Sequence, residues 1–356
     1  MILVTGANGF VGSTLCRALS ERGRPVRACV RASRVSRESK PTKPTKSTKP
    51  TKPQDQVLGL QAHEHLHVTD GVTTCIAPDL GQSTDPSEWT KHLVGCHTVV
   101  HTAAMAHVMS PSAADIEQFH HVNVSGTLML ARLAYEAGVR RFVFMSTVKV
   151  HGERTLPGQP FTADQPRVAS DPYARSKQQA EEGLMALAQQ TGLELVIIRP
   201  PLVYGPGVSG NLEVLMRWMR RGVPLPVGAI TDNARSLVGV DNLVDLIITT
   251  IDHPNAANRQ FLVSDDHDLS TLSLVQQLGR AGHIPVRTLA LPQPLLRLLA
   301  RLVGRSHYLD RLTENLQVNI EATKESLGWQ PPLSVAQSMA RLFEHETVSK
   351  RANADL

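Results

Sequence analysis

The fold is decided by the stretch Thr5-Gly6-Ala7-Asn8-Gly9-Phe10-Val11-Gly12, which follows an apolar run and precedes an amphipathic helical pattern at 14–22. A glycine-rich turn between a strand and a helix brings backbone N–H groups close to a pyrophosphate, and the helix N-terminus favours its negative charge. A tight turn with close helix packing uses glycines in the same way, so the position at a strand-turn-helix junction is what favours a dinucleotide site. The expected cofactor contacts are Gly6, Asn8, Gly9, Phe10, Val11 and Gly12.

Short apolar runs alternate with helical patterns over the first 200 residues. Strands are expected at 1–4, 26–30, 72–76, 98–101, 142–145 and 195–198, and helices at 116–137 and 173–191. This alternation predicts an α/β fold with a Rossmann-type, doubly wound parallel sheet. We expect a dinucleotide-binding domain at 1–200 and mainly a smaller substrate-binding lobe at 201–356. The two should interleave around 235–265, because residues 261–264 have the pattern of one more strand.

The repeat PTKPTKSTKPTKP interrupts this alternation, within a low-complexity insertion at 33–56. Such a stretch has too little apolar surface to offset its ordering entropy, so we interpret it as a surface insertion of open role. The formal net charge of +5 is matched by five of its lysines, namely Lys40, Lys43, Lys46, Lys49 and Lys52. The charge therefore says little about the folded body. Aromatic residues make up only 4% of the chain, so no nucleic-acid partner is expected.

Three other classes of feature are expected to be missing. The four cysteines lack Cys-x-x-Cys spacing, which favours reduced thiols and a cytoplasmic location. The cluster His63-Glu64-His65-Leu66-His67 is interpreted as polar surface, and no metal is expected. No run approaches about 18 apolar residues, so no membrane insertion is expected. Residues 289–303 have the pattern of an amphipathic helix packed on the body, with contact to a membrane surface as the alternative.

The adenosine end of the cofactor should lie near Arg31. Dinucleotide enzymes often carry an acidic residue at this distance beyond the glycines, where it binds the ribose hydroxyls. An arginine suits a 2′-phosphate instead, so the cofactor is NAD or NADP, with NADP slightly favoured. A solvated arginine at a strand end is the alternative. Further cofactor contacts are expected from Asp79, Leu80, Thr102, Ala103 and Ala104.

The segment Asp171-Pro172-Tyr173-Ala174-Arg175-Ser176-Lys177 predicts a proton-transfer pair. Proline suits the first turn of a helix, and a spacing of four then places the phenol of Tyr173 and the ammonium of Lys177 on one face. An adjacent cation lowers the pKa of a phenol, whose ordinary value near 10 makes it a poor base. Lys177 can also reach the nicotinamide ribose. An isolated pair of this kind is often coincidental, so further residues are needed.

Hydroxyl residues at the carboxyl end of a strand support the assignment of Tyr173 and Lys177 to a reaction site. Thr147 follows the run at 142–145, and ligands of parallel sheets bind at that edge. Thr147 is expected to hydrogen-bond the reacting oxygen, and Ser146 to line the same site. Asn123, in the preceding helix, is expected to position a water or a backbone carbonyl near Lys177. An ordinary polar residue in mid-helix is an equal alternative for Asn123.

Together these motifs resemble the extended short-chain dehydrogenase/reductase family, in particular its nucleotide-sugar epimerase and dehydratase branch. The resemblance rests on the order and spacing of GANGFVG, HTAA, NVSGT, the ST before YARSK, and RPPLVYGPG at 199–207. It implies a Rossmann fold, a nicotinamide cofactor that Pro200 also contacts, and Thr147, Tyr173 and Lys177 as catalytic triad with Asn123 in support. It further implies a homodimer formed through the helices at 116–137 and 173–191.

The substrate implied by the resemblance is a nucleotide sugar. Asn211, Arg235 and Arg311 are the implied substrate-binding residues together with Thr147, and the planar fork of an arginine suits the diphosphate. The implied reaction is hydride transfer at C4 of a UDP-hexose, by a 4-epimerase or a 4-ketoreductase of surface polysaccharide biosynthesis. Arg31 favours the 4-ketoreductase, which uses NADP. A dehydratase is disfavoured because Val148 and Lys149 stand where dehydratases carry acidic residues.

Two departures and two other functions remain open. His151-Gly152 stands where many relatives have Tyr-Gly, and the Lys/Pro/Thr repeat lies close to the adenosine end of the site. One alternative function is a non-catalytic protein that senses a dinucleotide. The other is a reductase of steroid-like or flavonoid ketones, for which Arg235 has no use.

Overall fold

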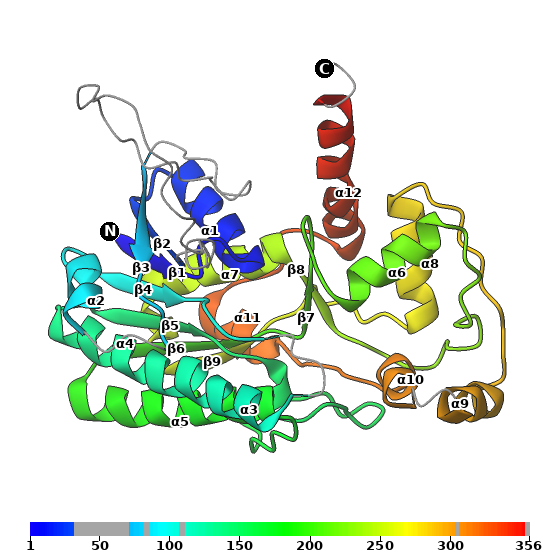
Figure 1. Ribbon diagram of the computed structural model, residues 1–356, viewed down its shortest axis with the longest axis horizontal. Coiled ribbons are helices and arrows are strands. Elements are labelled where there is room, and N and C mark those ends of the chain that lie inside the picture. Colours follow the sequence, from blue (N-terminus) through cyan, green and yellow to red (C-terminus); the bar gives the residue numbers. More distant parts are fainter. Residues whose placement is uncertain (32–70, 82–85, 107–110, 303–305, 353–356) are drawn as a thin grey trace, which may run out of the picture.

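A seven-stranded parallel sheet forms the body of the computed structural model, which describes residues 1–31, 71–81, 86–106, 111–302 and 306–352 (Figure 1). The sheet has the strand order β3-β2-β1-β4-β5-β6-β9. Its strands are β1 (Ile2–Thr5), β2 (Val26–Arg31), β3 (Val72–Ala77), β4 (Thr98–His101), β5 (Arg141–Met145), β6 (Glu194–Arg199) and β9 (Arg259–Leu262). The order reverses between β1 and β4, so the predicted doubly wound α/β fold is confirmed. The Lys/Pro/Thr repeat and the His63–His67 cluster lie outside the described residues.

Alternate residues of each strand face two helical layers. Leu3 of β1 packs on one face, whereas its neighbours Ile2 and Val4 pack on the other, as a side-chain period of two requires. Figure 1 shows α3, α4 and α5 on one side of the sheet and α1 and α7 on the other. The helices of the first layer are α2 (Pro86–Leu93), α3 (Ala113–Phe119), α4 (Gly126–Glu136) and α5 (Pro172–Thr191); those of the second are α1 (Phe10–Glu21), α7 (Val240–Asp252) and α11 (Glu321–Leu327).

The helix expected at 116–137 consists of three segments. A π-helical segment, η2 (His120–Ser125), joins α3 to α4, and it contains the buried Asn123. Single π-helical turns within α-helices are frequent at functional sites, because the extra residue re-aims the side chains that follow. The sequence pattern predicted a single helix over 116–137 and did not reveal this segment.

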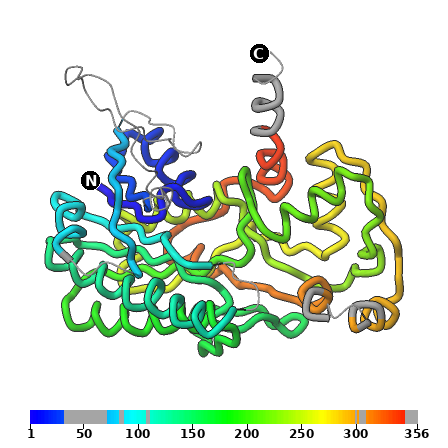
Figure 2. Tube along the Cα trace, in the orientation of Figure 1, coloured from blue at the N-terminus to red at the C-terminus, as the bar shows by residue number. Residues whose placement is uncertain are grey.

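A smaller lobe has a core of its own around Met216, Leu278 and Met339. Its elements are the two-stranded parallel ribbon of β7 (Leu202–Tyr204) and β8 (Leu237–Gly239), with α6 (Asn211–Arg220), α8 (Thr271–Ala281), α9 (Gln293–Leu302), α10 (Ser306–Thr313) and α12 (Val335–Ala352). Between β8 and α8 the chain returns to the body, where α7 packs on α1 and β9 pairs with β6. The trace in Figure 2 then runs from α8 along the outer edge of the lobe to α9.

Among the described residues, no helix has both the length and the apolar character needed to cross a membrane.

Candidate active site

The glycine turn is shaped by contacts that leave no room for side chains. Gly6 has φ of +66°, and a Cβ there would lie 2.8 Å from the backbone nitrogen of Ala103. A Cβ on Gly12 would lie 2.2 Å from the carbonyl oxygen of Gly6, while the Gly9 N–H donates to that same oxygen at 2.8 Å. Close packing of helix α1 on the turn therefore requires glycine at 6 and 12.

The same turn fits the pyrophosphate of a dinucleotide. Gly9 is the N-cap of α1 and provides no side-chain cap, so the first-turn N–H groups remain open for an anion. The turn lies at the carboxyl end of β1, beside the point where the strand order reverses, and parallel α/β sheets bind ligands at such points. Asn8, Phe10 and Val11 lie in or directly after the turn and would line the bound cofactor.

Gly12→Ala is expected to damage this turn. Its methyl group would clash with the Gly6 carbonyl, so we expect the free energy of unfolding to fall by about 1–3 kcal/mol, the usual cost of overpacking. Calorimetric titration should also show weaker binding of NAD, because the turn must open. Ser13→Ala, one position along the helix, adds no atom and is the control. An unchanged affinity in Gly12→Ala would contradict a pyrophosphate site here.

The ends of β1 and β4 are tied together at the edge of the sheet. The Thr102 hydroxyl donates to the Thr5 carbonyl at 2.6 Å, and the Ala103 N–H donates to the Thr5 hydroxyl at 3.4 Å. His101, fully buried, has its Nδ1 2.7 Å from the Thr5 hydroxyl and its Nε2 3.0 Å from the Thr127 hydroxyl. Burial, aided by the charge of Lys177, lowers the pKa of His101 to about 3, so this ring is neutral. Ala104 follows directly on this edge.

The residues expected at the adenosine end are more loosely arranged. Arg31 is the exposed last residue of β2. The Asp79 carboxylate accepts from the Gly81 N–H at 3.0 Å, so one oxygen is used by the local turn. The carbonyl of Leu80 approaches Gly126 at the start of α4 so closely that a Cβ there would lie 2.6 Å away. Pro200, at the far side of the edge, accepts from the Val148 N–H through its carbonyl at 3.0 Å.

Helix α5 carries the predicted proton-transfer pair. Asp171 is its N-cap and accepts from the Ala174 N–H at 2.7 Å, and Pro172 occupies the first turn. Lys177, one turn after Tyr173, is 2% exposed; its Nζ donates to the Met145 carbonyl at 2.7 Å. Burial lowers the pKa of Lys177 to about 7, against the opposing effect of the Glu181 charge.

The sequence predicted that Lys177 lowers the pKa of Tyr173, and in this structure that direction is wrong. Burial, and secondly the charge of Asp171, raise the pKa of the phenol. The lysine does not offset this because its Nζ is held by the Met145 carbonyl, 4.4 Å from the centre of the Phe144 ring. A phenolate at Tyr173 therefore requires a rearranged Lys177 or a further cation nearby.

Thr147 and Asn123 fix the surroundings of this pair. Thr147, buried at the end of β5, accepts from the Lys149 N–H at 3.3 Å and caps the short 3₁₀ turn η3 (Val148–Val150), which packs on α5. The Asn123 amide holds both the N–H and the carbonyl of Met105, at 2.8 and 3.0 Å, and donates to the Ser176 hydroxyl at 3.0 Å. Asn123 thus joins the segment after β4 to α5 beside Lys177.

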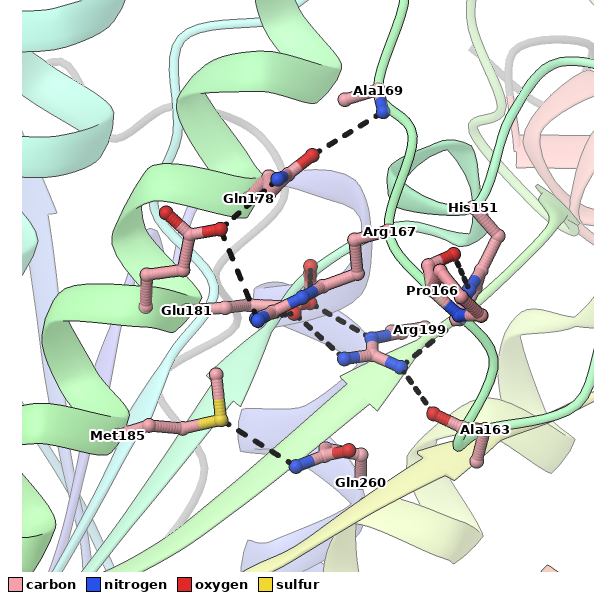
Figure 3. A network of polar contacts seen from close by, with 12 residues as sticks. His151, Ala163, Pro166, Arg167, Ala169, Gln178, Glu181, Met185, Arg199 and Gln260 are labelled. Carbon is pink, nitrogen blue, oxygen red and sulfur yellow. Dashed lines mark hydrogen bonds and ion pairs between the residues drawn. The ribbon is translucent and has the colours of Figure 1, made fainter.

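Ser146, expected to line the reaction site, takes part in a buried polar network beside it. Its hydroxyl donates at 2.5 Å to Glu181, which meets Arg199 and Arg167 in the network of Figure 3. The same carboxylate accepts from Arg199 at 2.9 and 2.7 Å and from Arg167 at 3.3 Å. The Glu181 side chain is 0% exposed and that of Arg199 is 2% exposed, so this ion pair is fully enclosed.

His151 completes the network and explains one departure from the family pattern. Its Nε2 lies 3.0 Å from Arg199 Nη1, and a guanidinium has no acceptor, so Nε2 must be the unprotonated nitrogen. Nδ1 then carries the proton and faces the Pro166 carbonyl at 3.4 Å. Burial and the charge of Arg199 lower the pKa of His151 to about 4. The network thereby ties the segment at 151–167 to β6 and α5.

Sequence reasoning missed the network of Glu181, Arg199 and His151. Two signals were present: Glu181 lies four residues after Lys177 on the same helix face, and Arg199 ends an otherwise apolar strand. Charged residues in buried positions are nearly always paired, so these two were candidates for one another.

The three residues expected to bind substrate lie in the smaller lobe. Arg235 Nη1 donates to the carbonyls of Arg311 and Glu314, at 2.8 and 3.1 Å. Burial lowers the pKa of Arg235, and the nearby charge of Arg311 adds to this effect. The structure therefore brings the two arginines together at the end of α10. Asn211 is exposed on another element, as the first residue of α6.

The buried Lys177 makes a testable contribution to pH dependence. A pKa lowered from 10.5 to about 7 means that the folded chain binds one proton fewer than the unfolded chain between these values. Stability should therefore rise with pH, by about 1.4 kcal/mol per unit from this group between pH 7 and 10. Denaturant unfolding of nucleotide-free protein and of Lys177→Met would measure it as the difference between the two slopes. Parallel slopes would contradict the buried, discharged lysine.

Comparison with known proteins places this geometry in a family. The model of the family described as "NAD dependent epimerase/dehydratase family" matches residues 2–264. A UDP-glucose 4-epimerase of Vibrio cholerae is 41% identical over 337 residues, which cover 94% of this chain and 92% of that protein.

Solved structures agree on the fold. A UDP-glucose 4-epimerase of Thermotoga maritima with UDP-glucose superposes with a TM-score of 0.71 at 20% identity, covering 98% of this chain and 99% of that one. A UDP-glucuronic acid 4-epimerase of Bacillus cereus in complex with NAD has a TM-score of 0.71 at 18% identity, with 97% and 95% covered. The sequence matches extend over both the glycine turn and the Tyr173–Lys177 helix. The chain therefore belongs to the NAD dependent epimerase/dehydratase family and is an enzyme of the short-chain dehydrogenase/reductase type.

Proposed function

We propose that this enzyme is an NAD-dependent 4-epimerase that moves hydride at C4 of a UDP-hexose. The observation that carries the proposal is the placement of Thr147, Tyr173 and Lys177 around the carboxyl ends of β5 and β4, next to the glycine turn. The 41% identity to a UDP-glucose 4-epimerase, over nearly the whole chain, supports this reaction over the others that such a site can perform.

The roles of the residues follow from their chemistry. The chemistry supplied by a bound nicotinamide is reversible hydride transfer, and the glycine turn with Thr102, Ala103, Ala104 and Pro200 would hold it. Tyr173 takes the proton from the C4 hydroxyl and returns it, while Thr147 donates a hydrogen bond to the reacting oxygen. Lys177, drawn from the Met145 carbonyl toward the cofactor ribose, supplies the cation that lowers the pKa of the phenol. Asn123 holds the wall beside Lys177.

The diphosphate is assigned to the arginine pair of the smaller lobe. Arg235 is anchored through one nitrogen by the carbonyls of Arg311 in α10 and of Glu314 directly after it, which fixes the direction of its remaining donors. Arg311 adds a second positive charge beside it, and two guanidinium groups match a diphosphate in charge and in hydrogen-bond geometry. Asn211 is assigned to the sugar or its nucleotide at the start of α6.

A 4-ketoreductase using NADP is the second candidate, and Arg31 is the observation that favours it. Arg31 is exposed at the end of β2, free to meet a 2′-phosphate if one is bound there. An epimerase returns hydride to the same substrate and retains its nucleotide, whereas a reductase releases oxidised cofactor in each cycle. The nucleotide that copurifies with the protein therefore separates the two.

The deciding experiment incubates the purified protein with UDP-glucose without added nucleotide and follows UDP-galactose by chromatography. We expect interconversion, together with bound NAD released on denaturation. Turnover of a UDP-4-keto-6-deoxy sugar only when NADPH is supplied would establish the reductase instead. A protein that binds the dinucleotide but turns over neither substrate would contradict both enzymes and favour a sensor.

A homodimer is proposed through the outer face of α4 and α5. A hollow there is lined by Leu128, Met129, Arg132, Gly183, Ala186, Leu187 and Gln190. Gly183 packs so closely on α4 that a Cβ would lie 2.7 Å from the Leu128 side chain, so the two helices present a broad common surface. Sedimentation of Ala186→Arg against the unaltered chain tests it. A surface polysaccharide role and a cytoplasmic location remain predictions from the sequence.

A further inference from the structure

Helix α9 presents apolar side chains that the described part of the chain leaves exposed. The helix lies at the end of the smaller lobe, beside α10 and far from β3 (Figure 1). Leu296, 6% exposed, packs into the core of the lobe and anchors the helix. Leu295 and Leu298, in contrast, are 42% and 55% exposed. The two leucines are not needed to hold α9 in place, so their exposure requires another explanation.

The order of side chains around α9 is that of a helix lying at an interface. Successive residues are about 100° apart, so Leu298 lies about 60° from Leu295, and Arg301 about 60° beyond Leu298 on the same side. Arg297 follows next, and both arginines are exposed. The buried Leu296 lies on the opposite side of Leu295. The exposed leucines thus lie between the protein surface and a row of positive charge.

The surrounding sequence carries the same charge. Residues 289–312 contain four arginines, at 297, 301, 305 and 311, but one acidic residue, Asp310, and no lysine or glutamate. Leu289 before α9 and Leu312 in α10 are also exposed, at 48% and 40%. Apolar side chains bordered by arginines match the boundary of a bilayer that contains anionic lipids, where the leucines enter the headgroup region and the arginines pair with phosphates.

We propose that α9, with Leu312 of α10, seats this enzyme on an anionic membrane surface. A second copy of the chain is a poorer occupant, because a twofold contact through this face would set arginines against arginines. The binding is reversible and salt-sensitive, since the face is small and its charged part is screened over about a Debye length. The variants that test it change none of the residues assigned to catalysis or to substrate binding.

Vesicle co-sedimentation tests the proposal. The charge of the five lysines at 40–52 is enough to attract anionic vesicles by itself, so all proteins carry Lys40→Gln, Lys43→Gln, Lys46→Gln, Lys49→Gln and Lys52→Gln. In this background we expect binding to vesicles of equal parts phosphatidylcholine and phosphatidylglycerol at low salt, and little binding to phosphatidylcholine alone. Leu295→Ser with Leu298→Ser, or Arg297→Gln with Arg301→Gln, should each weaken binding about tenfold or more.

Matched control variants distinguish the effect of the α9 leucines from that of exposed apolar side chains elsewhere. Val94→Ser and Leu156→Ser, at side chains 63% and 64% exposed elsewhere, should leave vesicle binding unchanged. Failure of the lysine-free background to bind anionic vesicles, or equal binding by the α9 variants, would overturn the proposal. So would loss of a dimer in the leucine variant without any vesicle binding, which would assign the face to a second copy. UDP-sugar turnover in solution should be equal in all variants, so a failed membrane test leaves the proposed reaction standing.

Discussion

Tyr173→Phe is expected to lower kcat by about 10²- to 10⁴-fold, the range that a positioned acid-base group contributes. The ring keeps its edge contact with Phe119, at 6.2 Å between centroids, because phenylalanine occupies the same space. Only the phenolic O–H is lost, and with it the group that exchanges a proton with the C4 hydroxyl. Affinity for NAD and the free energy of unfolding should therefore remain close to those of the unaltered enzyme.

The measurement is initial-rate kinetics with UDP-glucose, combined with calorimetric titration of the nucleotide. Tyr135→Phe, on the exposed surface of α4, removes the same atom outside the site and serves as the control. Retention of more than about a tenth of kcat in Tyr173→Phe would contradict its role as proton carrier.

Glu181→Gln is expected to reduce the free energy of unfolding by about 3–5 kcal/mol, because it leaves the guanidinium of Arg199 buried without its counter-charge. Arg199→Met should cost less, because the carboxylate keeps its contact with the partly exposed Arg167. The double variant Glu181→Gln with Arg199→Met leaves neither charge of the pair buried without the other, so it should recover much of the loss, and the coupling between the two sites should be large.

Denaturant unfolding of the four proteins gives this coupling as a double-mutant cycle. Glu182→Gln, on the next residue of α5 with 48% of its side chain exposed, should change the stability by less than about 0.5 kcal/mol. Additive losses in the double variant would show that the two residues do not act as a pair.

The body of the fold was accessible from the sequence because it depends on local patterns. The strands β1, β2, β4, β5 and β6 were expected to within one or two residues, since a parallel strand covered on both faces is a short continuous apolar run. The glycine turn could be predicted as well, because its glycines are required by contacts between residues close in sequence, such as that of Gly12 with Gly6. The spacing of Tyr173 and Lys177 is likewise a property of one helix.

The tertiary structure decided what depends on packing between distant segments. The environment of Lys177 follows from burial against β5, which reverses the expected direction of the pKa of Tyr173. The hydrogen bond of Ser146 depends on the position of Glu181, and Glu181 is held in turn by Arg199, 18 residues away. The π-helical turn at Asn123 was also not visible in the periodicity of the sequence. Sequence alone thus determined the sheet, the cofactor turn and the family, because local pattern and spacing encode them. Burial, charge pairing and side-chain direction belong to the folded chain, because each depends on which distant segments exclude water from a group.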